Sequence, residues 1–424
     1  MYASADQDRP WAVRPPEDFA IRLRHGVPEF PVHHMRGGTS TGLVIWDALA
    51  PRELALREEL LRHLMGVPLT GESPGNRQIT GLGRGPATSN KVFFVDVEAG
   101  PAGPRLVSTL AQLAAHTAAI DWNVNCGNMS AALPLWALEM GWATPSAGGP
   151  CSIAIRNTNT GVITLGRLQR QAGGGLEVSA IPGVDGAFPA VDLFLHAPVG
   201  AKTGTLLPTG RPVDDIDGYR VSCVDVAVPM VIADAAQFGK TAHEPVAELE
   251  ADRDFIAALR KVWIAAGLRM GLKGSDGIPL TEAALARSET LPKVCIVGEP
   301  RHGGHLSARY FTPQTAHASL AVSGGCCIAS AALIPGTVAH AIARGLPAVG
   351  GDLGDCRVAI ENPAGVLDTT IVARRAPEGI QIASAAYRRS AQVLLRGHVP
   401  LYRASGDLRA WLIRAAEASP IAPA

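Results

Sequence analysis

The sequence lacks the cysteine and histidine spacings that hold disulfides or metal ions. Its seven cysteines are scattered, odd in number and without a Cys-x-x-Cys pair, so they indicate neither a disulfide framework nor a zinc knuckle. The 12 histidines include no His-x-x-x-His or His-Glu-x-x-His spacing. A catalytic metal therefore has no visible set of ligands, and we expect no metal and no cofactor.

The chain also lacks net charge and long apolar runs. The 38 lysines and arginines equal the 38 aspartates and glutamates, which argues against a general nucleic-acid binder. No apolar run reaches membrane-spanning length without glycine, proline or charge, and residues 1–19 have no apolar core of a signal peptide. We expect a soluble cytoplasmic protein with no nucleic-acid or membrane partner. Its 424 residues, 47% of them hydrophobic, suffice for two domains with substantial cores.

Lysine is scarce as well, because only six of the 38 basic residues are lysine. Where only a positive charge is needed this chain uses arginine, so a retained lysine could do what arginine cannot, namely lose its proton. Lys91 stands at the start of a predicted strand over 92–96. It could be a carboxylate clamp, a proton-transfer group or a solvated strand end.

One cysteine stands where a helix is expected to begin. Cys126 lies in Asn125-Cys126-Gly127-Asn128, and an apolar run with helical spacing follows over 129–140. Unpaired backbone N–H groups and the helix dipole at such a position favour thiolate over thiol. Cys126 is therefore a candidate proton acceptor or nucleophile, although many lone cysteines are only small buried hydrophobes.

Two loops are rich in glycine and hydrogen-bond donors. Residues 30–35 predict a strand that enters the loop 36–42, and extended structure resumes over 43–46. The second loop, 78–91, leads into the strand that begins near Lys91. Such loops can bind anions, yet the first has no P-loop ending and is also consistent with an ordinary glycine hairpin.

The remaining pattern indicates two similar halves behind an N-terminal extension over 1–29, with domains over 30–215 and 216–424. Buried helices are expected in each half, because Ser130-Ala-Ala-Leu133 recurs as Ser330-Ala-Ala-Leu333 on an apolar helix after a glycine and cysteine loop. Many short strands around one buried helix suggest a curled sheet. The other predicted helices span 51–66 and 245–270. The other predicted strands span 152–156, 161–165, 175–178, 221–232, 294–297 and 308–311.

The segments MRGGTSTG, GLGRGPATSNKVFFV, NCGNMSAA, VDVAVPMV and HASLAVSGGCCIASAALIPGT occur in one order over residues 30–400. In that order they resemble the 2-methylaconitate cis-trans isomerase family, which includes oxalomesaconate and methylitaconate isomerases. The resemblance implies the α+β fold of diaminopimelate epimerase, with two pseudo-symmetric halves, each a curled, mostly antiparallel sheet around a central helix, and a site between them. It also implies a cofactor-independent allylic proton shift or cis-trans isomerisation of a small unsaturated di- or tricarboxylate.

By this resemblance, Cys126 matches the family's catalytic thiol and Lys91 its catalytic lysine. A thiolate and a lysine can exchange protons with opposite ends of an allyl system, while cations and donors stabilise the enolate-like intermediate. We expect a homodimer or a higher oligomer. The expected substrate-binding residues are Arg36, Gly37, Gly38, Thr39, Ser40, Ser89, Asn125, Gly127, Asn128, Lys273, Arg309, His317, Ser323, Gly324 and Gly325.

The sequence departs from the family pattern in places. Thr41 replaces a common lysine, and Thr80 stands where an aspartate is often found. Alignment on the glycine loop puts Ala321 or Val322 at the second cysteine of the epimerases, and we favour it over the alignment that puts Cys326 there, so that Cys326 and Cys327 are expected in the core. Three alternatives remain: a racemase or epimerase that uses Cys126 and Cys326, a pyridoxal phosphate enzyme with Lys91 as its Schiff base, and a non-catalytic paralogue that binds polycarboxylates.

Overall fold

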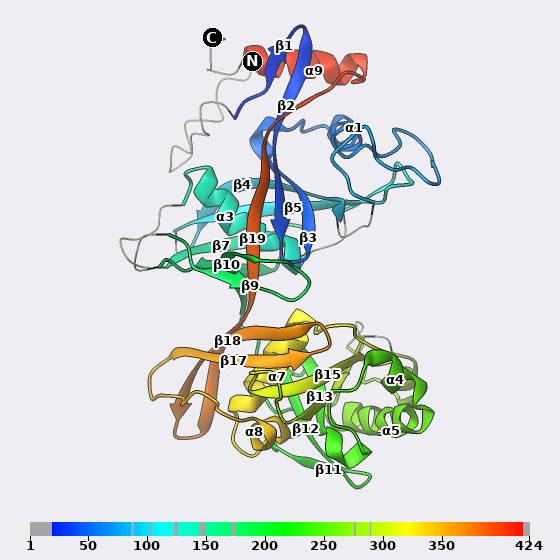
Figure 1. Ribbon diagram of the computed structural model, residues 1–424, viewed down its shortest axis with the longest axis vertical. Helices are drawn as coiled ribbons and strands as arrows, with labels where there is room; N and C mark the ends of the chain where they lie inside the picture. Colours follow the sequence, from blue (N-terminus) through cyan, green and yellow to red (C-terminus); the bar gives the residue numbers. More distant parts are fainter. Residues whose placement is uncertain are drawn as a thin grey trace. The chain divides into compact units, whose positions relative to one another are not determined.

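The computed structural model describes residues 19–85, 89–101, 103–122, 126–143, 150–171, 175–274, 277–288 and 290–418. Contacts divide them into two compact units (Figure 1). Unit 1 contains the described residues of Met1–Ala180, Gly186–Val191 and Arg389–Ala424, and unit 2 contains those of Ile181–Asp185 and Asp192–Arg388. No helix in these ranges has the length and apolar character that crossing a membrane requires.

The sheet of unit 1 alternates hairpins with parallel crossovers. Its strands pair in the order β19, β2, β3, β4, β5, β7, β8, where β3–β4 and β5–β7 are parallel and the other neighbours are antiparallel. β10 pairs with β8, β9 and β19, so the order returns to its start and the sheet is curled. The strands are β1 Arg22–Arg24, β2 Val27–Gly37, β3 Ser40–Trp46, β4 Lys91–Gly100, β5 Gly103–Leu113, β6 Ile120–Asp121, β7 Cys151–Asn157, β8 Ile163–Leu168, β9 Val178–Ala180, β10 Ala187–His196 and β19 Gly379–Pro400.

Unit 2 repeats this topology. Its strands pair in the order β11, β12, β13, β14, β15, β17, β18, β19, and again only β13–β14 and β15–β17 are parallel. The predicted α+β fold with two pseudo-symmetric halves is therefore confirmed. The strands are β11 Asp214–Ile216, β12 Tyr219–Val226, β13 Val228–Asp234, β14 Lys293–Gly298, β15 Leu306–Thr312, β16 Thr315–Ala316, β17 Gly354–Asn362 and β18 Gly365–Ala376.

The helices provide the crossovers that parallel strands need. In unit 1, α1 (Leu54–Met65) joins β3 to β4, and α2 (Gly127–Ser130) with α3 (Ala132–Glu139) lies between β5 and β7. In unit 2, α4 (Val246–Ala251), α5 (Arg253–Arg269) and α6 (Glu282–Arg287) join β13 to β14, and α7 (Val322–Leu333) and α8 (Val338–Ile342) join β15 to β17. The short helices η1 (Asp47–Leu49) and η3 (Ala235–Phe238) follow β3 and β13.

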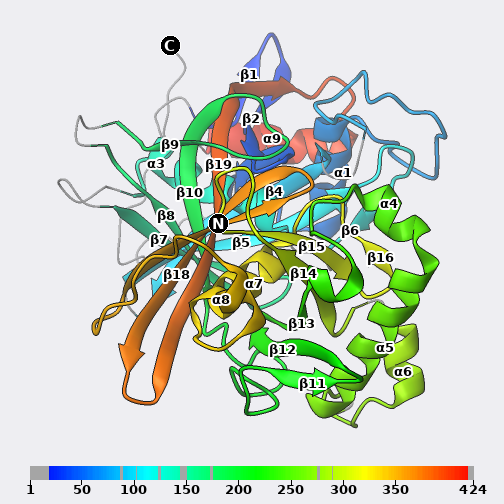
Figure 2. The ribbon, with the colours of Figure 1, turned by 60° about the horizontal axis from the view of Figure 1, so that its bottom comes forward.

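The two apolar helices form the centres of the units, as their sequence predicts. Residues 132–137 of α3 and 324–333 of α7 are all buried. α7 contacts β12, β13, β17 and β18 (Figure 2). Cys326 and Cys327 are 0% exposed, which confirms them as core residues.

Some local predictions differ from the structure. The helix expected over 245–270 is two helices, because Asp252 adopts an extended conformation and its side chain accepts a hydrogen bond from the Phe255 amide at 3.0 Å, which caps α5. The glycine loop expected before the second apolar helix is helical, and Gly324 and Gly325 lie inside α7. The strand expected over 175–178 begins only at Val178.

The C-terminal segment returns to unit 1. β19 pairs with β2 along Pro400↔Glu29 to Ala391↔Gly37, and α9 (Gly406–Glu417) contacts α1, β1 and β2 (Figure 1). Leu408 and Leu412 of α9 join Leu60, Leu61 and Leu64 of α1 in one apolar core. The same core contains Phe30 and Val32 of β2 and Leu43 and Ile45 of β3.

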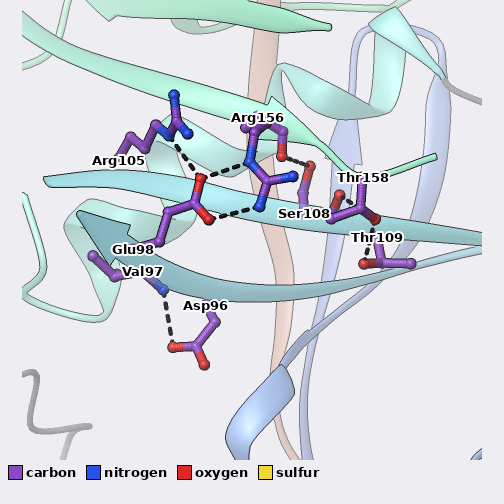
Figure 3. Close-up of polar contacts among 8 residues, drawn as sticks. All are labelled: Asp96, Val97, Glu98, Arg105, Ser108, Thr109, Arg156 and Thr158. Carbon is purple, nitrogen blue, oxygen red and sulfur yellow. Dashed lines mark hydrogen bonds and ion pairs between the residues drawn. The ribbon is translucent and has the colours of Figure 1, made fainter. Parts of the chain in front are cut away.

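Ion pairs connect β4, β5 and β7 near the turn between β4 and β5 (Figure 3). Glu98 on β4 accepts a bond of 2.7 Å from Arg105 on β5 and two bonds of 2.6 Å from Arg156 on β7. Hydrogen bonds from Arg156 outweigh burial and, with those from Arg105, lower the pKa of the Glu98 carboxyl to about 2. The cluster therefore fixes the register of three strands with one carboxylate.

Candidate active site

Cys126 is the residue immediately before α2. Its backbone is extended, with φ −135° and ψ 99°, and its Sγ accepts a hydrogen bond from the Met129 amide at 3.5 Å. Its carbonyl oxygen accepts bonds of 2.9 Å from the amide and the hydroxyl of Ser130. Cys126 is half-buried, whereas the other six cysteines are buried. The first helical turn thus holds the one partly accessible thiol.

The first glycine loop is a tight hairpin between β2 and β3 that packs on this helix start. Gly37 pairs with Ser40, and a Cβ on Gly37 would lie only 2.6 Å from the Asn128 carbonyl oxygen. The hydroxyl of Ser40 lies 3.8 Å from the Cys126 sulfur. The hydroxyl of Thr39 accepts a hydrogen bond of 3.3 Å from the side-chain amide of Asn128. The hairpin interpretation is therefore correct, and the hairpin carries donors to the thiol.

Lys91 is the first residue of β4 and is only 4% exposed. It pairs with Gly42 of β3, where any side chain would collide with the Lys91 carbonyl at 2.3 Å. Opposed residues share a sheet face, so Lys91, Gly42 and Ser40 all face the side that carries Cys126. Burial lowers the pKa of the Lys91 ammonium, and the charge of Cys126 acts in the opposite direction. The two predicted proton-transfer groups thus interact electrically.

Arg36 occupies the opposite face of the hairpin, across from Thr41. Its Nη1 donates to the carbonyl oxygens of Gly38 at 2.8 Å and Ser390 at 3.1 Å, and its guanidinium carbon lies 4.6 Å from the centre of the Phe188 ring. These contacts hold the hairpin against β19. Thr41 Oγ1 is buried and has no hydrogen-bond partner among the described residues.

Sequence reasoning missed the amide pair that closes the second loop. Gln78 Nε2 donates to Asn90 Oδ1 at 3.1 Å, and Asn90 Nδ2 donates to Gln78 Oε1 at 3.0 Å. The same oxygens accept the amides of Arg84 and Gly85. Gln78 has a positive φ of 54°, and Asn90 is 0% exposed. This closed loop fixes the residue before Lys91, and only the polar residues flanking the glycines hint at it.

Arg389 is a second residue that the sequence did not reveal. It lies on β19, and its Nε donates to Asn128 Oδ1 at 2.8 Å. Its Cδ lies 3.2 Å from where a Cβ on Gly38 would be. Asn128 is therefore held between Arg389 and Thr39, and the guanidinium stands beside the hairpin. No sequence motif distinguishes Arg389 from the many other arginines of this chain.

The other predicted binding residues fall into separate groups. Ser89 and Gly127 lie in unit 1 near Lys91 and Cys126 in the sequence, while Asn125 lies outside the described residues. In unit 2, the Cβ position of Gly324 is 2.5 Å from the Tyr310 ring, which also contacts the His317 ring. Ser323 and Gly325 are in the same helical turn. Lys273 is exposed and follows α5. Arg309 lies on β15 and lines a cavity of unit 2 that contains none of the other predicted binding residues.

The helix start of unit 2 carries no thiol. The residue before α7 is Ala321, which makes no side-chain cap. Ser330–Leu333 forms the last turn of α7, whereas Ser130–Leu133 is near the start of α2 and α3. The two copies of this repeat are therefore not at equivalent positions, which favours the alignment on the glycines. Cys326 is 0% exposed and lies inside α7, so its position does not match that of Cys126, which precedes its helix.

Known proteins match most of this chain. Residues 28–402 match the family described as PrpF protein. The chain is 33% identical over 344 residues to 4-oxalomesaconate tautomerase from Pseudomonas putida, which covers 80% of this chain and 88% of the relative. It is 28% identical over 397 residues to 3-methylitaconate isomerase from Eubacterium barkeri, covering 87% and 96%. The crystal structure of a methylitaconate-delta-isomerase superposes with a TM-score of 0.70 at 26% identity, covering 92% of this chain and 99% of the other.

Proposed function

The chain belongs to the PrpF protein family and is an isomerase, and we propose that it moves a double bond in a small unsaturated di- or tricarboxylate. The proton-transfer pair of this proposal is Cys126 and Lys91. The observation that carries it is their common location: a half-buried thiol before α2 and a lysine only 4% exposed face the same side of the β2–β3–β4 sheet. The relatives named above act on oxalomesaconate and methylitaconate, which supports this substrate class.

In the proposed reaction, the deprotonated member of the pair removes a proton from the carbon next to the double bond. The C–H electron pair forms the new double bond, and the electrons of the old one move onto the conjugated carboxylate or carbonyl as an enolate. The protonated member then gives a proton to the far carbon of the allyl system, which returns the enolate to a carboxylate or carbonyl and leaves the C=C bond one position away. Atoms and charge balance, and no oxidant or reductant is consumed.

The enolate-like intermediate needs fixed donors and cations, because it carries an additional negative charge. Thr39, Ser40 and Asn128 supply donors around the thiol. Arg389 supplies a cation that the hydrogen bond to Asn128 holds beside the hairpin. In this proposal Arg389 and Asn128 bind a substrate carboxylate, and Arg36 shapes the hairpin from its other face.

Proton NMR in deuterated buffer tests the proposal with cis- and trans-aconitate, methylaconitate, methylitaconate and oxalomesaconate. We expect the wild type to interconvert isomers of at least one member and to introduce deuterium at an allylic carbon. Cys126→Ser should lower the rate about 100- to 10,000-fold, which is the usual contribution of a positioned acid or base. Cys151→Ser is the matched control, because Cys151 is a buried cysteine of the same unit.

Full turnover in Cys126→Ser would reject the thiol as a proton-transfer group. A wild type that binds these acids without isomerising or exchanging any of them would place its substrate outside the panel. The homo-oligomer and the cytoplasmic location stay predictions. Sedimentation velocity on the full chain checks the first.

A further inference from the structure

Unit 2 contains a cavity of about 530 Å³ that the proposed reaction does not use. Three chain segments meet there: the loop before α4 with His243, the β14–β15 loop with His302, and the end of β17 with Glu361. One ligand atom from each of these side chains lies within 4.8 Å of the other two. Two imidazoles and one carboxylate are a donor set that binds zinc and related metals.

Glu361 is held as an anion by backbone amides. It is 3% exposed, and its Oε1 accepts the N–H groups of Arg301 at 3.0 Å, Gly304 at 2.9 Å and His302. Burial alone disfavours the charged carboxylate, but the three amides outweigh it and lower the pKa of Glu361. Among the described residues, Oε2 accepts only the Arg301 amide, at 2.9 Å. This oxygen retains a lone pair for a further partner.

His243 has the ring orientation that metal-binding histidines usually have. Its Nε2 lies 2.9 Å from the Glu299 carbonyl oxygen. A carbonyl only accepts, so Nε2 carries a proton, and in the neutral ring the lone pair is then on Nδ1. A backbone carbonyl that holds the second ring nitrogen is the common outer contact of a histidine ligand, because it fixes the tautomer.

His302 completes the set from the exposed side. Its ring lies 5.8 Å from the His243 ring at an angle of 78°. No described residue forms a hydrogen bond with this ring. Rotation of an exposed side chain costs little. His302 can therefore bring a ring nitrogen to about 2.0–2.2 Å from a zinc ion, the usual length of a zinc–ligand bond.

The backbone is built to bring these loops together. A Cβ on Gly304 would lie 2.6 Å from Glu361 Cγ, and a Cβ on Gly298 would lie 2.1 Å from the Thr241 carbonyl oxygen. Both glycines are therefore required for the approach of their loops. They keep Glu361 under the β14–β15 loop and His243 beside the end of β14.

Two arginines also line the cavity, and neither side chain forms a hydrogen bond with Glu361 in the described residues, but the charges of Arg309 and Glu361 interact. Arg309 donates from Nε to the Glu244 carbonyl at 2.7 Å and from Nη1 to the Ala308 carbonyl at 3.1 Å. Arg301 is exposed, so solvent screens its charge. In the described part of the chain, no arginine or lysine forms an ion pair with Glu361.

We propose that His243, His302 and Glu361 bind one divalent metal ion of the zinc class, with a fourth position open to water or a small carboxylate. The three ligands come from three loops, so the ion would join the loop before α4, the β14–β15 loop and the end of β17. The site is independent of the proposed isomerase chemistry, because none of its three ligands belongs to the proposed proton-transfer pair.

Titration calorimetry of the full chain with ZnCl₂ tests this site, and Co²⁺ absorption reports the ligands. The protein is used as Cys126→Ser, because an accessible thiolate also binds zinc. We expect one ion per chain, a four-coordinate cobalt spectrum without a thiolate charge-transfer band, and at least about tenfold weaker binding in His302→Ala and His243→Gln. His116→Ala is the matched control, since His116 is an exposed histidine in unit 1.

Equal affinity in His302→Ala and in the parent would overturn the assignment, as would the absence of stoichiometric binding in the parent. If the cavity binds phosphate or citrate and excludes zinc, the two arginines determine its ligand and the metal proposal fails. Circular dichroism of each variant shows that it is folded, so that lost binding cannot be attributed to unfolding.

Discussion

Each unit starts the fourth strand of its repeated topology with a lysine, and the two lysines have different surroundings. Lys91 begins β4 and Lys293 begins β14, each after a parallel crossover. Burial lowers the pKa of both ammonium groups. In unit 1 the buried helix begins after Cys126, whose sulfur caps it, whereas in unit 2 it begins after Ala321, which offers no cap.

The difference teaches that the repeated backbone does not by itself make a proton-transfer site. Both units supply a helix that runs into the core and a lysine at the start of a strand, but only unit 1 has a thiol immediately before that helix. Its hairpin also brings Ser40 to 3.8 Å from that sulfur. The proposed chemistry therefore depends on a few side chains placed on a topology that occurs twice.

The largest expected effect comes from replacing Lys91 with arginine, and the same change at Lys293 is its matched control. Lys91→Arg keeps the charge but cannot lose a proton, so kcat/KM should fall about 100- to 10,000-fold. Lys293→Arg should stay within about threefold of the wild type, because it changes no group of the proposed pair. The NMR isomerisation assay measures both. An equal loss of kcat/KM in the two variants would contradict the assignment of proton transfer to Lys91 rather than Lys293.

Arg388 and Arg389 sharpen the comparison, because neighbouring residues of β19 belong to different units. Arg388 donates from Nε and Nη2 to both oxygens of Asp192, at 2.8 and 3.0 Å, and both side chains are buried. Arg388→Met removes this pairing and should lower the free energy of unfolding by about 3–5 kcal/mol. Urea unfolding measures it, with the exposed Arg375→Met as control. A change under 1 kcal/mol, roughly the value of a surface pair, would contradict the prediction.

Arg389→Gln should act on the substrate rather than on stability. The loss of a charged hydrogen-bond donor to a carboxylate costs about 1.5–3 kcal/mol, which corresponds to roughly a 10- to 100-fold rise in KM. We expect kcat to change less than KM in steady-state kinetics. Arg396→Gln, an exposed position on the same strand, is the control. If only kcat falls, Arg389 acts on the reacting atoms and not on binding.

The smallest effect concerns the far end of β4, which continues to Gly100 with the Glu98 cluster while β14 ends at Gly298. The pKa of Glu98 is lowered to about 2 from 4.5. Its stabilisation is therefore present above about pH 4.5 and is lost as the pH falls through about 2. Since the group is partly exposed, Glu98→Gln should cost only about 1 kcal/mol at pH 7. Chemical unfolding at several pH values checks this against Glu53→Gln, and a difference that is as large at pH 2 as at pH 7 would contradict the assignment.

Local patterns in the sequence predicted the parts of the molecule that depend on periodic burial. The hairpin over 30–46, α1, β4 and the buried helices were predicted, since glycine, proline and apolar spacing fix them locally. The break at Asp252 was missed because a capping aspartate resembles any polar residue of a helix surface. The glycines of α7 were assigned to a loop because their close packing on Tyr310 and Leu367 is a tertiary contact.

The site followed the same rule. The sequence could single out Cys126 and Lys91 because each stands at the start of an element, where its residue type is informative. Arg389 reaches Asn128, and Gln78 pairs with Asn90, through contacts that depend on the path of the chain. The cluster of His243, His302 and Glu361 has no spacing signature for the same reason, because its members come from three separate loops.

The return of β19 to unit 1 has a consequence for biosynthesis. A ribosome releases the chain in order, so residues 192–388 of unit 2 emerge before the strand that pairs with β2. Until residues 389–400 appear, the outer edge of β2 lacks its partner, and Arg36 and Asn128 lack Ser390 and Arg389. Unit 1 can therefore be completed only after residues 192–388 have emerged, in contrast to a domain that folds before the chain beyond it is made. A nascent chain acquires the proposed catalytic centre only with its last strand.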